Sequence, residues 1–232
     1  MILPGTSYFE YLTEWGLGHR IHQTAEGLRA LTVNALYRGA DGIYVYNFFT
    51  PSDFDQKKID KEGNVSIVNE METMLTEGGD FEQSIDKPRR HILSWHQPGI
   101  SSNVDWFLPH KFEINMPKAY DIFTGPKPGH LAYIVRLMLH DDPGYTTAAF
   151  KVEVNGEAAI QIEDLLRDPE YIYESSKTIT VKHVSELGAR VIQFAAGGET
   201  IKDGYNTLTI TNVDDMPISV KWIEVYIGNE LF

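Results

Sequence analysis

Residues 150–157 read FKVEVNGE, and this stretch indicates the fold more strongly than any other part of the chain. Apolar side chains at 150, 152 and 154 alternate with charged side chains at 151 and 153, which is typical of a strand with one buried face. The Asn-Gly pair that follows is the strongest short-range signal for a β-hairpin. The stretch therefore predicts two antiparallel strands with one face in a core.

The same alternation recurs on both sides of this hairpin. Leu208 and Ile210 alternate with threonines, and a further apolar face consists of Ile223, Val225 and Ile227. Strands are expected near residues 90–95, 110–116, 130–140, 148–154, 157–162, 178–183, 189–195, 206–212 and 218–227. Short alternating segments between turn residues are typical of an antiparallel β-sandwich, and we expect a jelly roll over residues 89–232.

Residues 1–88 follow a different pattern, and we treat them as a separate lead-in. Residues 1–20 are aromatic and irregular. Helical spacing of apolar residues predicts a helix over residues 22–38, and a continuous apolar run predicts a strand at residues 43–49 that is covered on both faces. Residues 50–64 are expected to form a polar loop.

A second helix is expected to end at Gly78 and Gly79. Its apolar face would consist of Ile67, Val68, Met71, Met74 and Leu75. A helix followed by a buried strand and another helix is typical of a parallel α/β sheet, so the lead-in is predicted to be a short α/β segment.

Composition restricts the function. The chain has 33 acidic and 20 basic residues, a net charge of −13, which disfavours nucleic acid and anionic membranes as partners because both require clustered Lys and Arg. No apolar run approaches the about 20 residues of a membrane helix. With no cysteine there is no thiolate nucleophile, and no His pair has a carboxylate at metal-ligand spacing, so neither metal nor cofactor is predicted. The cellular compartment stays open.

Three segments carry a resemblance to a known family. Residues 28–48, with GADGIYVYNF at positions 39–48, resemble the last helix–strand unit of TIM-barrel glycoside-hydrolase-like proteins of environmental and gut bacteria. Residues 75–95 are similar to that family's closing helix and the first strand of its C-terminal sandwich. Residues 150–156 and 204–210 are similar to a hairpin and a strand of galactose-binding-like jelly rolls. The resemblance implies the C-terminal part of a longer glycoside-hydrolase-like protein.

Catalysis by the chain alone is not expected. Glycoside hydrolysis uses two carboxylates that flank the scissile bond, and in a barrel they come from the ends of different strands. The single predicted barrel strand cannot supply that pair. The resemblance implies a catalytic parent protein and an accessory role for this portion of it.

Candidate sugar contacts lie around the boundary between lead-in and sandwich. Tyr46 and Asn47 end the predicted barrel strand, where they could stack on a sugar ring and bind a hydroxyl group, and Asp53 follows in the loop. Trp95 and Trp106 come just after the boundary. Each of these residues has packing or solvent exposure as its alternative role, and we expect carbohydrate binding to be weak.

The apolar strand at residues 43–49 must be covered. We therefore expect the lead-in to pack on the sandwich or on a second copy of the chain, as a homodimer. Two alternatives to an accessory portion stay open. An independent carbohydrate-binding module would expose an aromatic platform on a sandwich face or loop tip, and a purely structural or interaction domain would expose only polar surface.

Overall fold

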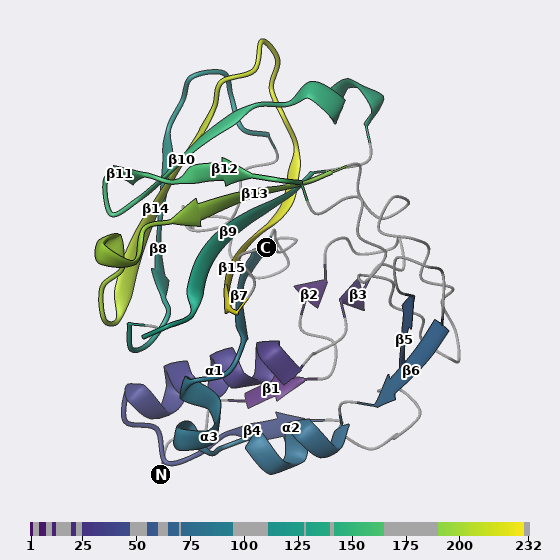
Figure 1. Ribbon diagram of the computed structural model, residues 1–232, viewed down its shortest axis with the longest axis vertical. Coiled ribbons are helices and arrows are strands. Elements are labelled where there is room, and N and C mark those ends of the chain that lie inside the picture. The colour runs from purple at the N-terminus through teal and green to yellow at the C-terminus, as the bar shows by residue number, and fades with distance from the viewer. Residues whose placement is uncertain are drawn as a thin grey trace.

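The computed structural model describes residues 1, 5–7, 11–12, 20–21, 25–46, 55–59, 65–69, 71–94, 111–127, 129–139, 142–164 and 190–229. These residues form an antiparallel β-sandwich with a smaller helical region at one end, and Figure 1 shows the helices below the sheets. The prediction of a mainly β chain is confirmed. The connection order of a jelly roll stays a prediction.

Two antiparallel sheets make up the sandwich. The five-stranded sheet has the order β12 (Ile160–Ile162), β13 (Val191–Ala196), β9 (Ala132–Leu139), β15 (Val220–Gly228) and β7 (Arg89–Ser94). The four-stranded sheet has the order β11 (Glu157–Ala158), β10 (Phe150–Val154), β14 (Tyr205–Asn212) and β8 (Lys118–Phe123).

The core lies between these sheets, and the alternating residues supply it. The side chains at 150, 152 and 154 are buried, as are Leu208 and Ile210 from β14 and the apolar face of β15. The turn after β10 also follows the prediction. Asn155 and Gly156 have φ angles of 54° and 87°, and two adjacent positive φ values are what a two-residue type I′ hairpin requires.

Parts of the sandwich depart from the predicted strands. At residues 110–116 only isolated bridges at Phe112 and Ile114 occur among the described residues, and the strand β8 follows at 118–123. The strand expected at residues 178–183 lies outside the described residues. Two short helical turns, η2 (Pro143–Thr147) and η5 (Gly198–Thr200), join strands of the sandwich.

The lead-in contains the helices α1 (Ala25–Tyr37), α2 (Met71–Glu77) and α3 (Phe81–Ile85). The helix α1 ends where the sequence predicts. Gly39 has a φ of 87° and donates its N–H to the carbonyl of Leu36, and Ala40 donates to the carbonyl of Ala35. A left-handed glycine with these bonds is a common helix stop.

The strands of the lead-in correct several expectations. Within residues 1–20, β1 (Gly5–Ser7) pairs in parallel with β4 (Tyr44–Tyr46), so the predicted barrel strand has a neighbour. The short strands β2 (Tyr11–Leu12) and β3 (Arg20–Ile21) form an antiparallel pair. Tyr44, the first residue of β4, is 55% exposed, so the expectation of a strand covered on both faces is wrong at this residue.

A hairpin replaces part of the expected loop and helix. The strands β5 (Asp55–Ile59) and β6 (Val65–Asn69) pair antiparallel over five positions. Ile67 and Val68 therefore belong to β6 and not to the second helix, which begins at Met71. Both residues are β-branched, and this side-chain shape favours a strand over a helix.

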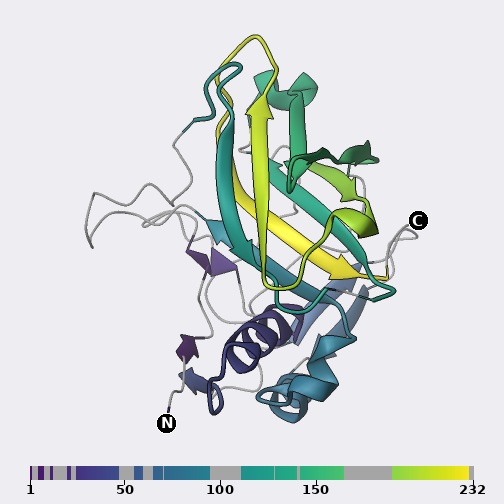
Figure 2. The same cartoon turned by 90° about the vertical axis from the view of Figure 1, so that its left-hand side faces the viewer.

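The lead-in packs on the sandwich of the same chain. The helix α1 contacts β7, and Figure 2 shows α1 across the lower end of the sheets. His91 of β7 lies directly opposite Val225 of β15, which lies opposite Val135 of β9. Residues opposite each other share a sheet face, so α1 meets the core-facing side of β7. The homodimer stays a prediction.

No helix in the described part of the chain is long and apolar enough to cross a membrane.

Candidate functional site

Of the five residues predicted from the sequence as sugar contacts, one, Tyr46, is among the described residues. Tyr46 is the last residue of β4 and pairs with Ser7 of β1 through the backbone. Asn47, Asp53, Trp95 and Trp106 lie outside the described residues, and these four stay predictions.

A different group of aromatic side chains meets at the boundary between lead-in and sandwich. Tyr37 ends α1, Phe81 begins α3, Phe123 ends β8 and Tyr205 begins β14. The ring of Tyr37 stacks on Phe81 with centroids 6.3 Å apart and lies 6.0 Å from Phe123. The rings of Phe123 and Tyr205 meet edge to face at 5.0 Å. All three contacts are within the usual range for aromatic pairs.

Arg38 completes this group, which we call the junction cluster: Tyr37, Arg38, Phe81, Phe123 and Tyr205. Its guanidinium carbon lies 4.9 Å from the ring centroid of Phe123 and 5.9 Å from that of Tyr205. Its Nη2 also donates to the Tyr205 hydroxyl at 3.4 Å. These are cation–π distances, and they hold the positive charge against the rings while it stays accessible to solvent.

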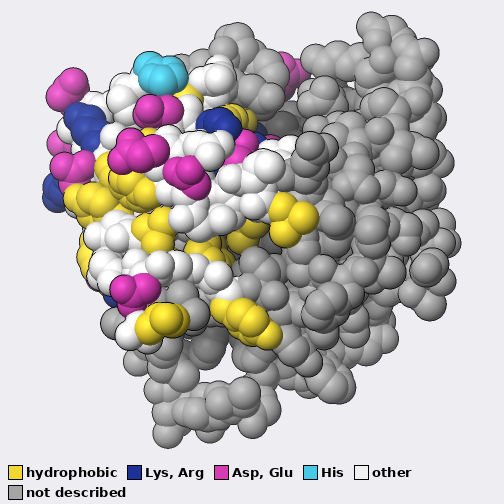
Figure 3. Space-filling model, turned by 90° about the horizontal axis from the view of Figure 1, so that it is seen from below, with side chains coloured by type: hydrophobic (Ala, Val, Ile, Leu, Met, Phe, Trp, Pro, Cys, Tyr) yellow, Lys and Arg dark blue, Asp and Glu magenta, His cyan; other side chains and the backbone are white. Residues whose placement is uncertain are grey.

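The junction cluster is open to solvent. Tyr37 and Tyr205 are 46% and 55% exposed, and Arg38 is exposed beside them. Figure 3 views the molecule from the side of the lead-in, where hydrophobic side chains gather near charged ones on the described half of the surface. An exposed group of aromatic rings next to an arginine can contact both the apolar and the polar parts of a ligand.

The backbone that presents Phe123 and Tyr205 is tightly built. The two residues lie directly opposite each other in the β8–β14 pair. Beyond them, Thr124 donates its N–H to the carbonyl of Gly204, and Gly204 donates to the carbonyl of Gly125, at 2.9 and 2.7 Å. Both glycines have positive φ, 74° at Gly125 and 79° at Gly204, which other residues adopt at a cost.

Gly125 also allows the lead-in to approach. A Cβ atom at Gly125 would lie 2.6 Å from Cγ1 of Val33 in α1, which is fully buried. The helix α1, whose C-terminal end carries Tyr37 and Arg38, is thus held against the end of β8. The junction cluster exists only because α1 and the sandwich are in contact.

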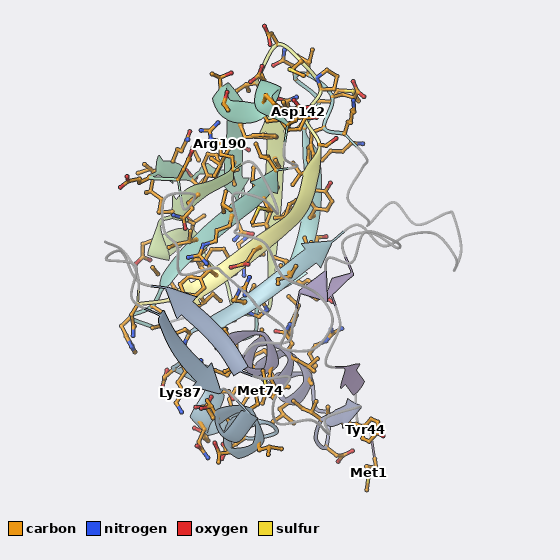
Figure 4. All side chains as sticks on the ribbon, turned by 90° about the vertical axis from the view of Figure 1, so that its right-hand side faces the viewer. Met1, Tyr44, Met74, Lys87, Asp142 and Arg190 are labelled. Atoms are coloured by element: carbon orange, nitrogen blue, oxygen red, sulfur yellow. The ribbon has the colours of Figure 1, made fainter. Side chains whose placement is uncertain are left out.

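An ion-pair network links α1, α2 and the segment that follows α3. Glu77 at the end of α2 accepts hydrogen bonds from Arg29 of α1 and from Lys87, the latter at 2.6 Å, and Arg29 donates to the carbonyl of Pro88 at 3.1 Å. Burial acts to raise the pKa of Glu77, but these two cations outweigh burial and lower it. Figure 4 shows the labelled Lys87 and Met74 in this helical region, away from Asp142 and Arg190 at the far end of the sandwich.

A second buried polar group crosses the outer face of the five-stranded sheet. Glu224 accepts from Arg136 at 3.0 Å and from Arg90 at 2.6 Å, and Arg136 also donates to Gln193 at 2.8 Å. Burial acts to raise the pKa of Glu224, but the two arginines hold it below its ordinary value. All four residues are at most 4% exposed, so this row is structural.

Neither the junction cluster nor the buried row around Glu224 was predicted from the sequence. Alternation in β15 places Glu224 on the face opposite the core, and the residue is nevertheless buried. The junction cluster combines residues from α1, α3, β8 and β14, and β8 itself was not predicted. The described residues include no group of three or more His, Asp or Glu side chains that could hold a metal ion.

No family model matches the sequence, and no curated protein matches it. Among solved structures, the chain is similar to a family 86 glycoside hydrolase in complex with neoagarooctaose, at 14% identity and a TM-score of 0.32, covering 62% of this chain and 20% of that chain. It is also similar to a β-porphyranase of the same family from the human gut bacterium Bacteroides plebeius, at 10% identity and a TM-score of 0.33, covering 82% of this chain and 32% of that chain.

A latent aurone synthase, a polyphenol oxidase, is another such structure, at 13% identity and a TM-score of 0.26, covering 78% of this chain and 40% of that chain. The chain thus spans between a fifth and two fifths of the length of these proteins.

Proposed function

We propose that this chain is the accessory β-sandwich portion of a glycoside-hydrolase-like protein, not catalytic by itself, and that it contacts carbohydrate weakly at the junction cluster. The sequence resemblance in residues 28–48 and 75–95 supports the first part of this proposal. The exposed rings of Tyr37 and Tyr205 beside Arg38 support the second part, and this observation carries the proposal.

The chemistry of the junction cluster suits a sugar. One face of a pyranose ring is formed by C–H groups that pack on aromatic rings, and its hydroxyl groups accept hydrogen bonds from a guanidinium. Arg38 is held in place by Tyr205, so binding would immobilise few additional side-chain rotors. One or two stacked rings contribute on the order of 1 kcal/mol each beyond buried area, so the Kd is expected to be roughly millimolar.

The composition of the junction cluster favours an accessory portion over an independent module. Tyr37, Arg38 and Phe81 come from the lead-in, whereas Phe123 and Tyr205 come from the sandwich. A sandwich that bound sugar independently would not need the helices. The division after Pro88 remains our proposal for the chain's organisation, with the two parts acting together.

The sites predicted from the sequence belong to the same proposal. Tyr46, Asn47, Asp53, Trp95 and Trp106 would extend carbohydrate contact along the boundary. Their contribution is separable from that of the junction cluster, because the two sets share no residue.

The test is a titration of soluble oligosaccharides into the intact chain, followed by NMR chemical-shift changes. Tyr205→Ala and Arg38→Met are expected to weaken binding about fivefold or more, since each removes on the order of 1 kcal/mol. Tyr44→Ala is the matched control, because Tyr44 is also 55% exposed and lies in β4, outside the junction cluster.

Each outcome of this titration distinguishes one proposed role of the chain from the others. Unchanged binding in Tyr205→Ala with loss in Trp95→Ala or Trp106→Ala would move the site to the residues predicted from the sequence. Trp222 belongs to β15 of the sandwich, and loss of binding in Trp222→Ala alone would favour an independent module. No binding of any oligosaccharide would leave a purely structural role, which the buried contact of α1 with β7 also fits.

A further inference from the structure

A small polar group lies buried between α1 and β7, separate from the junction cluster. It consists of Asn34 in α1 and of Arg89 and His91 in β7, and we call it the α1–β7 polar cluster. Arg89 and His91 are two residues apart on one strand, so both point to the core-facing side that α1 covers. Arg89 is 0% exposed and His91 is 5% exposed.

The guanidinium of Arg89 is only partly bonded. Its Nη1 donates to the carbonyl of Ile85 at the end of α3, at 2.8 Å. Its Nε and Nη2 are buried and have no hydrogen-bond partner among the described residues. These two nitrogens form the side-on edge of the guanidinium, whose parallel N–H groups match the two oxygens of a planar or tetrahedral oxyanion.

His91 presents a further donor. Asn34 Nδ2 lies 3.3 Å from His91 Nδ1, and with the amide oriented in this way the ring nitrogen accepts the bond. Burial, together with the nearby charge of Arg89, lowers the pKa of His91 to about 3, so the ring is neutral near pH 7. A neutral ring that accepts at Nδ1 carries its proton on Nε2, and Nε2 is buried without a partner in the described structure.

The charge of Arg89 adds to this excess of donors. No carboxylate of the described residues lies within ion-pair distance of Arg89, although the more distant Asp86 favours its charged form. Burial lowers the pKa of Arg89 to about 10, which still leaves it charged at neutral pH. A buried cation without a counter-ion is costly, and donors left unbonded cost about 1–3 kcal/mol each.

We propose that the α1–β7 polar cluster binds a small oxyanion, held side-on by Nε–H and Nη2–H of Arg89 and by Nε2–H of His91. The anion supplies the acceptors and the negative charge that these groups lack. The anion would also link β7 to the helices, because Arg89 of β7 is bonded to α3 and His91 of β7 is bonded to α1. Asn34 Oδ1, the acceptor of the cluster, is also buried without a hydrogen-bond partner among the described residues, and it lies 3.9 Å from the Cβ position of Gly125.

The probe for this site is sodium formate, with sodium chloride added to keep the ionic strength constant. A ligand that binds the folded chain raises the melting temperature, by about 3–6 °C at a formate concentration about ten times the Kd. Since Arg89 and His91 are buried, samples are equilibrated until the melting temperature is constant. Arg89→Lys keeps the charge but loses the side-on pair, so its response to formate is expected to disappear.

Lys151→Met is the control, because Lys151 is an exposed cation of β10 and its loss changes net charge alone. This variant should respond to formate as the unaltered chain does. If Arg89→Lys responds equally, the ion binds elsewhere and the proposal is wrong.

A second measurement requires no variant. In ¹⁵N-labelled protein, the Nε–H signal of Arg89 and the Nε2–H signal of His91 should shift together as formate is added. The same spectrum reports the tautomer, which must carry the proton on Nε2. Signals that do not respond, or a ring protonated on Nδ1, would mean that only water meets these donors, and this outcome would overturn the proposal even if Arg89→Lys does not fold.

Discussion

Between the two sheets the buried side chains are almost all apolar, whereas the contact of α1 with β7 buries Arg89, His91 and the Oδ1 atom of the half-buried Asn34. The helix α1 itself contributes mainly small buried side chains, such as Ala30, and the fully buried Val33. The sandwich is thus stabilised by apolar area, which changes little with pH. The attachment of the lead-in depends on close backbone approach and on charges, and it should be the part that conditions and single substitutions alter most selectively.

The largest expected effect on stability concerns the sandwich, at the buried charged row around Glu224. Glu224→Gln removes the carboxylate between Arg90 and Arg136, and both guanidinium groups stay buried beside a neutral amide. We expect the free energy of unfolding to fall by about 3–5 kcal/mol in urea denaturation. Glu157→Gln, on the exposed strand β11, should change it by less than about 0.5 kcal/mol. Equal effects of the two substitutions would show that the buried row contributes little.

The second prediction concerns pH and the attachment of α1. His91 has a folded pKa of about 3 against an ordinary value of 6.5, because burial, assisted by Arg89 and opposed by Glu224, disfavours its charged form. Protonation therefore favours the unfolded chain below pH 6.5, and stability is lost as the pH falls toward 3. The free energy of unfolding should decrease by at most about 1.4 kcal/mol per pH unit.

The window between pH 6.5 and 4.5 isolates this histidine. Glu77 and Glu224 have pKa values below their ordinary 4.5, so they lose their stabilising charges only at lower pH. In chemical denaturation, His91→Gln should remove the pH dependence within this window, while His130→Gln, at an exposed position, should keep it. Retention of the full dependence in His91→Gln would assign it to another group.

Comparing substitutions at two glycines tests how closely α1 and the sandwich approach each other. Gly125→Ala and Gly156→Ala both place a side chain at positive φ, at 74° and 87°. At Gly156 no atom lies within 4 Å of the new Cβ, whereas at Gly125 Val33 lies 2.6 Å from it. Thermal unfolding should show Gly125→Ala to be less stable than Gly156→Ala by about 1–2 kcal/mol, which is the cost of overpacking. A difference near zero would mean that α1 moves away from the sandwich without cost.

Sequence patterns predicted the sandwich better than the lead-in, for a physical reason. The strand β10 alternates strictly and the Asn155-Gly156 turn has a specific backbone requirement, so local sequence determines both. The strand β8 carries the same signal, with Tyr120 and Ile122 buried and Asp121 exposed, and it could have been recognised.

Other features depend on distant parts of the chain. The strands β5 and β6 are short and polar in part, and neither their pairing nor that of β1 with β4 follows from local spacing. The burial of Glu224 and the meeting of Tyr37 with Phe123 are set by packing between segments that the sequence separates by many residues. Periodicity reports which face of an element is apolar, and it does not report what covers the other face.

The smallest expected effect compares two cations on one carboxylate. Arg29 and Lys87 both bond Glu77, but the side chain of Arg29 is 13% exposed and that of Lys87 is 42% exposed. Solvent screens the exposed pair, so Lys87→Met should lower the free energy of unfolding by only about 0.2–1 kcal/mol, and less at high salt. Arg29→Met removes a better buried charged bond and the contact with Pro88, and should cost about 1.5–3 kcal/mol at either salt concentration. Urea denaturation of both variants at low and high salt is the measurement. If Lys87→Met proves as costly as Arg29→Met, solvent does not screen the pair of Lys87 with Glu77, and the contrast between a buried and an exposed charge does not hold.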